Sequence, residues 1–449
     1  MALEDMSEEF QASWAADTAF MPACPDGCVP YPFQRAGVEY ALRRKDCIIG
    51  DQMGLGKTVQ ALLVANEILA KRILIICPAS LRINWARESA VWLLWAEPVI
   101  VGYEEAVRRP ERIAGKWDLL IVDEAHKAKN PKARRTQVAL AARAERRLFL
   151  SGTPVVNRPI DLWPILYSID ERWGSQHQFG INYCAGRKMS MNLNTINPKT
   201  RQTVRRKRTW WDYSGASNTK ALQTHLRETC MVRRLKKTVL TQMPDKIRQM
   251  IVIGEAHNPA KDRARWAEWC DLTRAPVRTP EEVARLRVAK LRKLEELSKC
   301  RVNEMQDKVF PVIDYLRTVT EPVVVFAHHR AMIQALQEAF PHAVTVMGGM
   351  SEAAKQKSVD DFQAGATDMF IGNMEAAGVG YTLTRSSLVV FAEHDWVPGV
   401  MDQCEDRCHR IGQCDTVHVV YLVMDYSLEA YMCKVLLSKQ NIIDAVLDG

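Results

Sequence analysis

Short apolar runs alternate with longer segments of helical periodicity in two separate parts of the chain. The runs lie at residues 47–50, 73–77, 119–122 and 148–150, and again at 323–326, 369–371, 388–391 and 417–421. Strands that are apolar at every position are typical of parallel sheets covered by helices, because neither face meets water. The pattern therefore predicts an α/β protein with two parallel-sheet lobes.

Between these two parts the strand-like runs disappear, and polar, basic and helix-forming sequence replaces them. From Glu281 to Lys299 apolar residues recur near helical spacing, which predicts an amphipathic helix leading into the second lobe. Residues 190–203, rich in Asn, Thr and Lys, predict a mobile loop. We expect four parts: an N-terminal extension at 1–30, a first lobe at 31–160, a helical protrusion and linker with a basic insertion at 161–300, and a second lobe with C-terminal helices at 301–449.

The composition excludes several classes of protein. The chain has 449 residues, 47% apolar and 25% charged, which is typical of globular domains and not of disordered chains. No window approaches the roughly 18 consecutive apolar residues of a membrane span, and the acidic start is unlike a signal peptide. The 12 cysteines are scattered, which favours a reducing compartment. We expect a soluble intracellular protein without a membrane partner, in the cytoplasm or nucleoid of a prokaryotic or viral system or in a eukaryotic nucleus.

The formal charge of +8 is concentrated in one segment. Residues 199–248 contain 14 Lys+Arg and three Asp+Glu, a net charge of +11, so the remaining chain carries −3. Such a patch is expected where a protein binds a polyanion, because contact with phosphates releases condensed counterions. A solvated, charge-rich insertion would have the same composition, and composition leaves both interpretations open.

The segment Gly50–Thr58 has the features of a phosphate-binding loop, since it follows an apolar run and precedes a helix-like one. In such a loop backbone N–H groups surround phosphate oxygens, Lys57 reaches the β- and γ-phosphates, and Thr58 holds Mg²⁺. A strict pattern would have glycine where Asp51 stands. We expect ATP to be bound by Asp51, Gln52, Met53, Gly54, Leu55, Gly56, Lys57 and Thr58.

A second apolar run ends in two adjacent carboxylates, Asp123 and Glu124. They lie about 65 residues after the phosphate-binding loop. At this separation along the sequence, Asp123 is expected to hold Mg²⁺, and Glu124 is expected to orient and deprotonate the attacking water. The next run ends in Ser151–Pro154, where small hydroxyl residues could relay the state of the nucleotide or form a plain turn. The two carboxylates complete a predicted site for hydrolysis of a nucleoside triphosphate.

Further motifs are present at Phe33–Gly37, at Cys77–Leu81 with Asn84 and Trp85, and at 376–384, 396–399 and 403–413. With these motifs the sequence resembles the Swi/Snf family of ATPases, within the helicase superfamily that carries the DEAH box. The resemblance extends over nearly the whole chain and implies two RecA-like lobes. Segments at 179–184, 211–218 and 231–236 resemble the annealing-helicase, or HARP-type, branch of that family.

The resemblance assigns a role to several residues. It implies that Gln34 reads the adenine base and that Gly380 and Gln403 belong to the nucleotide site. It places Arg407 and Arg410 at arginine-finger positions, where a guanidinium delivered by lobe closure stabilises transition-state charge. The alternative for these arginines is a salt-bridged helix with Glu405 and Asp406.

DNA contacts are expected in two places. The resemblance implies that the segment of Pro78 and Ser80 touches the phosphate backbone. The basic insertion contributes Arg205, Arg206, Lys207 and Arg208, followed by Trp210 and Trp211. We interpret the cations as DNA contacts and the tryptophans as the core of the protrusion, although stacking on exposed bases is an alternative.

The resemblance implies a DNA-dependent ATPase that uses Mg²⁺ and ATP to translocate on double-stranded DNA and to remodel or reanneal branched DNA. We expect a monomeric motor; protein partners are not indicated. Two alternatives are a strand-separating DNA helicase and a non-catalytic, nucleotide-gated DNA clamp. A clamp has no need for Lys57, Asp123, Glu124 and both arginines together.

Overall fold

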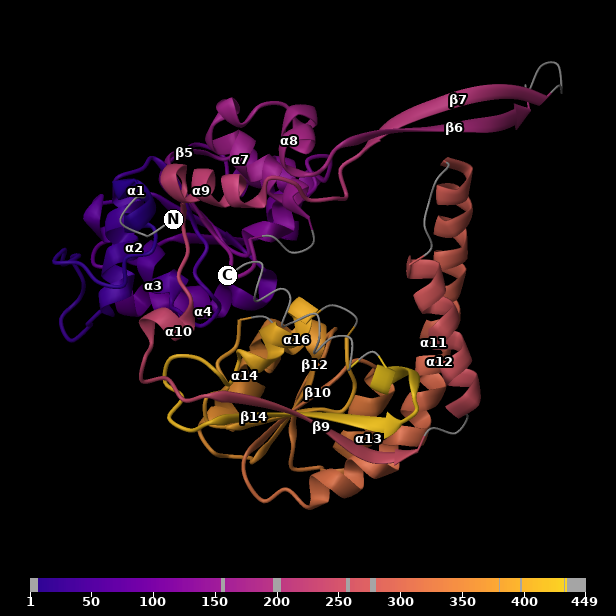
Figure 1. Cartoon of the computed structure of the whole chain (residues 1–449). Coiled ribbons are helices and arrows are strands. Elements are labelled where there is room, and N and C mark those ends of the chain that lie inside the picture. Colours follow the sequence, from indigo (N-terminus) through magenta and orange to yellow (C-terminus); the bar gives the residue numbers. More distant parts are fainter. Residues whose placement is uncertain are drawn as a thin grey trace.

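The computed structural model describes residues 7–154, 158–196, 203–255, 259–274, 280–378, 380–395, 398–431 and 433. Two sheets have six strands each, in the orders β3-β2-β4-β5-β1-β8 and β11-β12-β10-β13-β14-β9. Within both sheets the strands pair in parallel. The sheets belong to two lobes, which Figure 1 shows one above the other. The predicted α/β architecture with two parallel-sheet lobes is confirmed.

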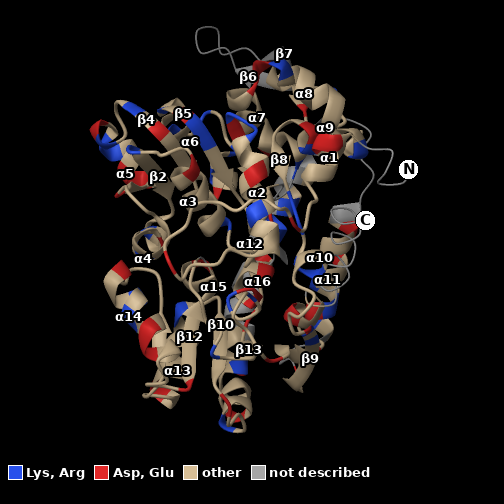
Figure 2. Ribbon diagram, turned by 90° about the vertical axis from the view of Figure 1, so that its left-hand side faces the viewer, with Lys and Arg blue, Asp and Glu red and all other residues tan. Residues whose placement is uncertain are grey.

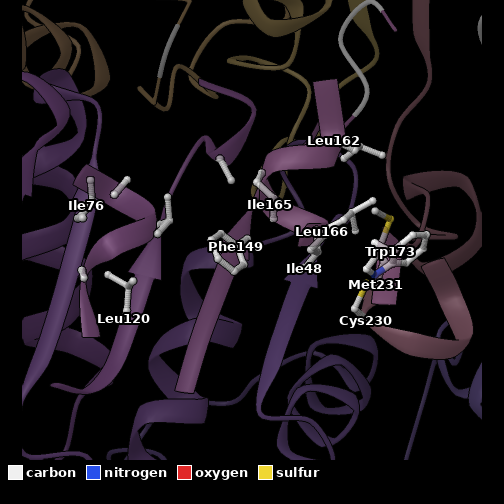
Figure 3. Close-up of a cluster of buried hydrophobic side chains, with 14 of the residues drawn as sticks. Ile48, Ile76, Leu120, Phe149, Leu162, Ile165, Leu166, Trp173, Cys230 and Met231 are labelled. Atoms are coloured by element: carbon white, nitrogen blue, oxygen red, sulfur yellow. The ribbon is translucent and has the colours of Figure 1, made fainter. Parts of the chain in front are cut away.

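Lobe one is built on the first sheet. Its strands are β1 (Asp46–Ile49), β2 (Ile73–Cys77), β3 (Val99–Gly102), β4 (Lys116–Val122), β5 (Arg143–Leu150) and β8 (Met231–Val232). Its helices include α2 (Pro32–Leu42), α3 (Lys57–Glu67), α4 (Arg82–Trp92), α5 (Tyr103–Arg108) and α6 (Arg134–Ala141). Neighbouring strand residues enter opposite clusters: Ile48 packs with Phe149 and Leu166, whereas Ile49 packs with α2 and α3. Figure 3 shows the cluster around Ile48. Both faces are covered, which explains the uninterrupted apolar runs.

Lobe two repeats this arrangement with the second sheet. Its strands are β9 (Lys246–Glu255), β10 (Val323–Ala327), β11 (Val344–Val346), β12 (Met369–Asn373), β13 (Leu388–Phe391) and β14 (Val417–Asp425). Its helices include α13 (Arg330–Ala339), α14 (Glu352–Gln363), α15 (Met374–Ala377) and α16 (Pro398–Glu405). One buried cluster lies on each face of the sheet, so this lobe has its own core.

The region predicted as a helical protrusion and linker, 161–300, is more varied than expected. The helices α7 (Trp163–Ile169), α8 (Gln176–Tyr183) and α9 (Thr219–Thr229) contribute buried side chains to the core of lobe one. The short strand β8 completes the first sheet, and β9 forms the edge of the second. The sequence signal for β9 was weak because its exposed and half-buried positions alternate at the sheet edge.

The predicted mobile loop at 190–203 is wrong where the structure describes it. Strands β6 (Arg187–Ile196) and β7 (Thr203–Asp212) pair in antiparallel fashion, and we call this pair the hairpin arm. Figure 1 shows the arm extending away from both lobes. Met189, Met191 and Leu193 alternate with polar residues, which is a strand pattern that the Asn-rich composition concealed. The basic insertion is therefore a β-hairpin and not a helical element.

Two antiparallel helices lead into lobe two, α11 (Pro259–Arg274) and α12 (Pro280–Arg317). The amphipathic helix predicted between Glu281 and Lys299 is confirmed as the first half of α12, with Leu297 buried against Leu428. The expected boundary at residue 300 falls inside this helix. None of the described helices combines the length and apolar character that a bilayer crossing requires.

The described part of the N-terminal extension packs on lobe one. Helix α1 (Glu8–Ala12) buries Phe10, and the following Trp14 ring lies 3.5 Å from the guanidinium carbon of Arg227. Arg227 also donates to the Ser13 hydroxyl at 3.3 Å. A cation from the basic segment is thus used inside the lobe.

Candidate nucleotide site between the lobes

The phosphate-binding loop joins the carboxyl end of β1 to the first turn of α3. Gly54 and Gly56 have φ of +83° and +70°, a left-handed conformation that glycine adopts without steric cost. A Cβ on Gly56 would lie 2.3 Å from the Gln34 amide nitrogen, so a larger residue would not fit. Met53 and Leu55 are buried, at 8% and 0% exposed. The loop thus has the shape that its sequence predicted.

Gln34 lies directly against this loop. It is buried, its amide Nε2 donates to Leu55 O at 3.2 Å, and its Oε1 accepts from the Tyr31 backbone N–H at 3.0 Å. The proposed adenine-reading residue and the phosphate-binding loop are therefore one hydrogen-bonded unit.

The side chain of Asp51 points away from the expected phosphate position. Its carboxylate forms an ion pair with Arg234 at 2.5 Å and accepts from the Gln60 amide at 2.8 Å. Asp51 and Arg234 are both fully buried. The prediction that Asp51 binds the nucleotide therefore applies only to its backbone groups, because its carboxylate is bound to Arg234 and Gln60. Its carboxylate instead anchors the loop to the segment after β8, and the sequence pattern gave no sign of this partner.

Lys57 and Thr58 begin α3 and are half-buried. The Lys57 ammonium donates to Asp51 O at 2.9 Å and to Gln52 O at 3.3 Å. Burial lowers the pKa of Lys57, and the negative charge of Glu124 opposes that shift. The lysine thus lies inside the loop and close to the second predicted motif.

Asp123 and Glu124 lie at the carboxyl end of β4. Asp123 Oδ2 accepts from the Trp85 indole at 2.9 Å, and its Oδ1 accepts from the Glu124 N–H at 2.8 Å. Burial, together with the charge of Glu124, raises the pKa of Asp123 to about 6. A nearby cation would relieve this cost, because it favours the charged carboxylate.

Mg²⁺ fits this donor set. It prefers hard oxygen ligands and commonly takes one or two from the protein, with the others from phosphates and water. The Thr58 hydroxyl and the Asp123 carboxylate are such donors, and each carboxylate oxygen retains a second lone pair. Among the residues that the structure describes, no group of three or more His, Cys, Asp or Glu side chains forms a metal site of its own.

His126 links the second motif to the third. Its Nδ1 lies 3.3 Å from Glu124 Oε2 and 3.2 Å from the Ser151 hydroxyl. Burial lowers the pKa of His126 to about 4, so the imidazole is neutral near pH 7. A Cβ on Gly152 would lie 3.3 Å from Lys57 Nζ. The segment after β5 therefore contacts both motifs, as a relay would require.

The expected DNA-contacting segment after β2 is only partly accessible. Pro78 is buried, and Ser80 is half-buried within the single turn η2 (Ala79–Leu81). Trp85 is 1% exposed, and its indole N–H donates to the Asp123 carboxylate. Trp85 is therefore a positioning residue for the carboxylate and not a DNA contact, whereas contact through Ser80 stays a prediction.

The second lobe meets the first at two of the predicted residues. A Cβ added to Gly54 would lie 2.9 Å from Arg410 Cβ, so the arginine-bearing segment abuts the phosphate-binding loop. A Cβ on Gly380 would lie 1.6 Å from a Leu81 methyl carbon, which places Gly380 against lobe one near η2. Gly380 is thus an interlobe contact residue in this structure, and its contact with the nucleotide stays a prediction.

The two predicted arginine fingers, Arg407 and Arg410, donate hydrogen bonds to backbone carbonyl oxygens. Arg407 is 7% exposed and donates to Gln403 O at 2.8 Å, while Arg410 donates to Tyr381 O at 3.2 Å. Burial lowers the pKa of Arg410 to about 10, and Glu88 of lobe one opposes that shift. Gln403 thus supports Arg407 through its carbonyl.

The alternative of a salt-bridged helix is wrong for these arginines. Glu405 pairs with Lys246 at 2.8 Å and Arg248 at 2.7 Å, and Asp406 pairs with Lys236 at 2.9 Å. Lys246 and Arg248 lie in β9, and Lys236 lies between β8 and β9. Arg407 and Arg410 are therefore not committed to the carboxylates beside them.

At the base of the hairpin arm, Trp211 is 39% exposed. Its ring lies 4.4 Å from that of His177, edge-on, and parallel to that of Tyr213 at 6.4 Å between centroids. Our interpretation of Trp211 as a core residue is wrong, because a two-stranded sheet has no second layer to cover it. The side chains of Arg205, Arg206, Lys207 and Arg208 lie outside the described part of the structure.

Residues 33–100 and 96–261 match the SNF2-related domain family, and residues 307–412 match the helicase conserved C-terminal domain. The chain is 31% identical over 445 residues to the "SWI/SNF-related matrix-associated actin-dependent regulator of chromatin subfamily A-like protein 1" of Xenopus tropicalis, covering 92% of this chain and 44% of that protein. It is 31% identical over 454 residues to the "DNA annealing helicase and endonuclease ZRANB3" of Homo sapiens, covering 93% and 40%.

The chain thus spans less than half the length of these curated relatives. The chain is also similar to a solved structure, "Sulfolobus solfataricus SWI2/SNF2 ATPase core in complex with dsDNA". The match covers 96% of this chain and 94% of that one, with 19% sequence identity and a TM-score of 0.42. The family matches extend across both lobes and include every motif from Gln34 to Arg410. The chain therefore belongs to the Swi/Snf family of helicase superfamily two, as its motifs predicted, and its place in the annealing-helicase branch stays a prediction.

Proposed function

We propose that this chain is a DNA-dependent ATPase that translocates on double-stranded DNA and remodels or reanneals branched DNA. The observation that carries the proposal is the interlobe site. Lys57 and Glu124 of lobe one lie on one side, and the Arg410 segment abuts Gly54 from the other. A relative named "DNA annealing helicase and endonuclease ZRANB3" further supports an annealing action on DNA.

The site residues divide the chemistry among them. Lys57 exchanges its loop carbonyls for the γ-phosphate, and Glu124, beside the neutral His126, orients the attacking water. Thr58 and Asp123 would hold Mg²⁺, which when bound neutralises phosphate charge. Arg407 and Arg410 approach from lobe two and stabilise charge in the transition state. Hydrolysis therefore depends on contact between the lobes.

DNA is proposed to contact the η2 segment through Ser80 and the hairpin arm through Arg205, Arg206, Lys207 and Arg208. The arm extends beyond the lobes, which makes it accessible to a long duplex (Figure 1). Trp211 adds exposed aromatic surface at its base. Cations beside aromatic rings are the combination that binds phosphates and unpaired bases.

The test is an ATPase assay of the purified chain with single-stranded, duplex and forked DNA. Lys57→Ala and Glu124→Gln should each lower turnover by at least about 100-fold, as expected for groups that act in the transition state. The exposed Lys71→Ala is the control from the same lobe and should behave like the parent. Turnover like that of the parent in either site variant would overturn the proposal.

Two further assays refine it. Displacement of a third strand from a triplex, without separation of a plain duplex, is expected for a translocase; the reverse result would favour a strand-separating helicase. We further propose that the motor acts as a monomer in the DNA-containing compartment of its cell. A mass measurement on the DNA-bound protein would check the first part.

A further inference from the structure

Residues 233–245 connect β8 of lobe one to β9 of lobe two, and we call them the linker. The start of the linker runs beside the phosphate-binding loop. Three successive loop residues bond to it: Gly50 O accepts from Arg233 at 2.7 Å, Asp51 pairs with Arg234 at 2.5 Å, and the Gln52 side-chain oxygen accepts from the Lys236 N–H at 2.8 Å. A displacement of the loop therefore displaces the linker as well.

Lys236 is the linker residue that bonds to both lobes at once. Its backbone N–H is held by Gln52 of lobe one, and its ammonium donates to Asp406 at 2.9 Å and to His409 O at 2.5 Å in lobe two. The side chain is 6% exposed, and a Cβ on Gly54 would lie 3.2 Å from its Cε. The aliphatic stem of Lys236 thus lies against the tip of the loop.

The lobe-two end of this connection is the arginine-bearing segment itself. Asp406 precedes Arg407, and His409 precedes Arg410. The two acceptors of the Lys236 ammonium are therefore each one residue from a predicted arginine finger. Burial opposes the charge on Lys236, lowering its pKa to about 8, and Asp406 partly offsets this effect.

We propose that Lys236 is a positioning residue that couples the phosphate-binding loop to the arginine fingers. A nucleotide that shifts Gln52 moves the Lys236 backbone, and the ammonium carries the movement to the segment of Arg407 and Arg410. This inference rests on the proposed ATPase function and extends it: the fingers respond to loop occupancy through the linker as well as through the ligand itself.

The test compares Lys236→Met, Lys236→Arg and Lys237→Ala with the parent chain. Methionine keeps the stem beside Gly54 and removes the charge. Asp406 retains Lys246 at 3.3 Å, so the variant leaves no unpaired buried carboxylate. Lys237 is the exposed neighbour and serves as the matched control. The measurements are ATP affinity, turnover with and without duplex DNA, and thermal unfolding.

We expect Lys236→Met to bind ATP like the parent and to lose at least about fivefold of its DNA-stimulated turnover, a typical size for coupling between two sites. Lys236→Arg restores a cation and should recover part of that turnover, whereas Lys237→Ala should change nothing. A purely structural role would lower the unfolding temperature and ATP affinity together, without a selective loss of turnover.

The outcomes separate the two proposals. A parent chain without DNA-stimulated ATPase activity would overturn the proposed function. A stimulated parent with an equally stimulated Lys236→Met variant would overturn the coupling inference alone. If Lys236→Met does not fold, the double variant Lys236→Met/Asp406→Asn removes both charges, and retention of full DNA stimulation in it would equally reject the inference.

Discussion

The linker and the hairpin arm both carry runs of cations, but they use them in different ways. Arg234 is fully buried and Lys236 is 5% exposed, and both pair with carboxylates at the nucleotide site. The arm instead leaves the body of the protein, and Lys188 and Trp211 at its base are exposed. One basic run is part of the internal structure, and the other lies on an element that extends away from both lobes.

This difference changes the meaning of the basic segment 199–248. Six of its 14 cations are used within the protein: Arg227, Arg233, Arg234, Lys236, Lys246 and Arg248. The net charge of +11 therefore overstates the charge offered to a polyanion. Figure 2 shows basic and acidic residues interspersed over both lobes. A charge run predicts a binding surface only where the fold supplies no internal carboxylates for it.

The strongest test of this comparison is Arg234→Met, which removes one partner of a fully buried ion pair. We expect the free energy of unfolding of lobe one to fall by about 3–5 kcal/mol, because Asp51 is left charged and buried. Urea denaturation followed by tryptophan fluorescence measures this change. The double variant Arg234→Met/Asp51→Asn should recover much of the loss, and a single variant as stable as the parent would contradict an internal role.

The opposite result is expected for the arm. Replacing Arg205, Arg206, Lys207 and Arg208 with alanine should leave unfolding and basal ATPase activity unchanged. DNA affinity should fall, and the slope of its logarithm against the logarithm of salt concentration should become less negative by up to about 0.9 for each DNA phosphate that the variant no longer neutralises. Alanine at the exposed Lys220 and Lys237, off the arm, is the control. An unchanged slope would remove the arm from the DNA-binding surface.

Much of the site could be predicted from the motifs, because each motif is formed by residues that are close together in the sequence. A strand, a glycine turn and a helix start fix the positions of Gly54 and Lys57 within a few residues. Asp123 and Glu124 follow for the same reason, since the end of a parallel strand presents its side chains at one sheet edge. The lobes were predictable because strands covered on both faces are continuously apolar.

Long-range partners were not predictable in this way. The pair of Asp51 and Arg234 joins residues 183 positions apart, and nothing in either local pattern indicates the other. Trp85 belongs to the same motif as Pro78 and Ser80, but its indole N–H donates to Asp123. The arm was missed because its strand alternation is carried by methionine and leucine among many polar residues. Local patterns place a side chain within its own helix, strand or loop, and the arrangement of these elements determines which side chains contact one another.

The smallest effect is expected at an exposed contact between the lobes. Arg87 of α4 forms two bonds with Asp360 of α14, at 2.9 and 2.8 Å, and the two side chains are 54% and 45% exposed. An exposed ion pair contributes no more than about 1 kcal/mol, so Arg87→Ala should change basal turnover by less than about fivefold. Because salt screens exposed charges, the remaining difference from the parent should vanish at about 1 M salt. In Lys236→Met, any change in turnover without DNA should be the same at low salt and at about 1 M salt, because buried charges are screened much less. Equal sensitivity of both variants to salt would mean that burial does not distinguish the linker contact from a surface contact.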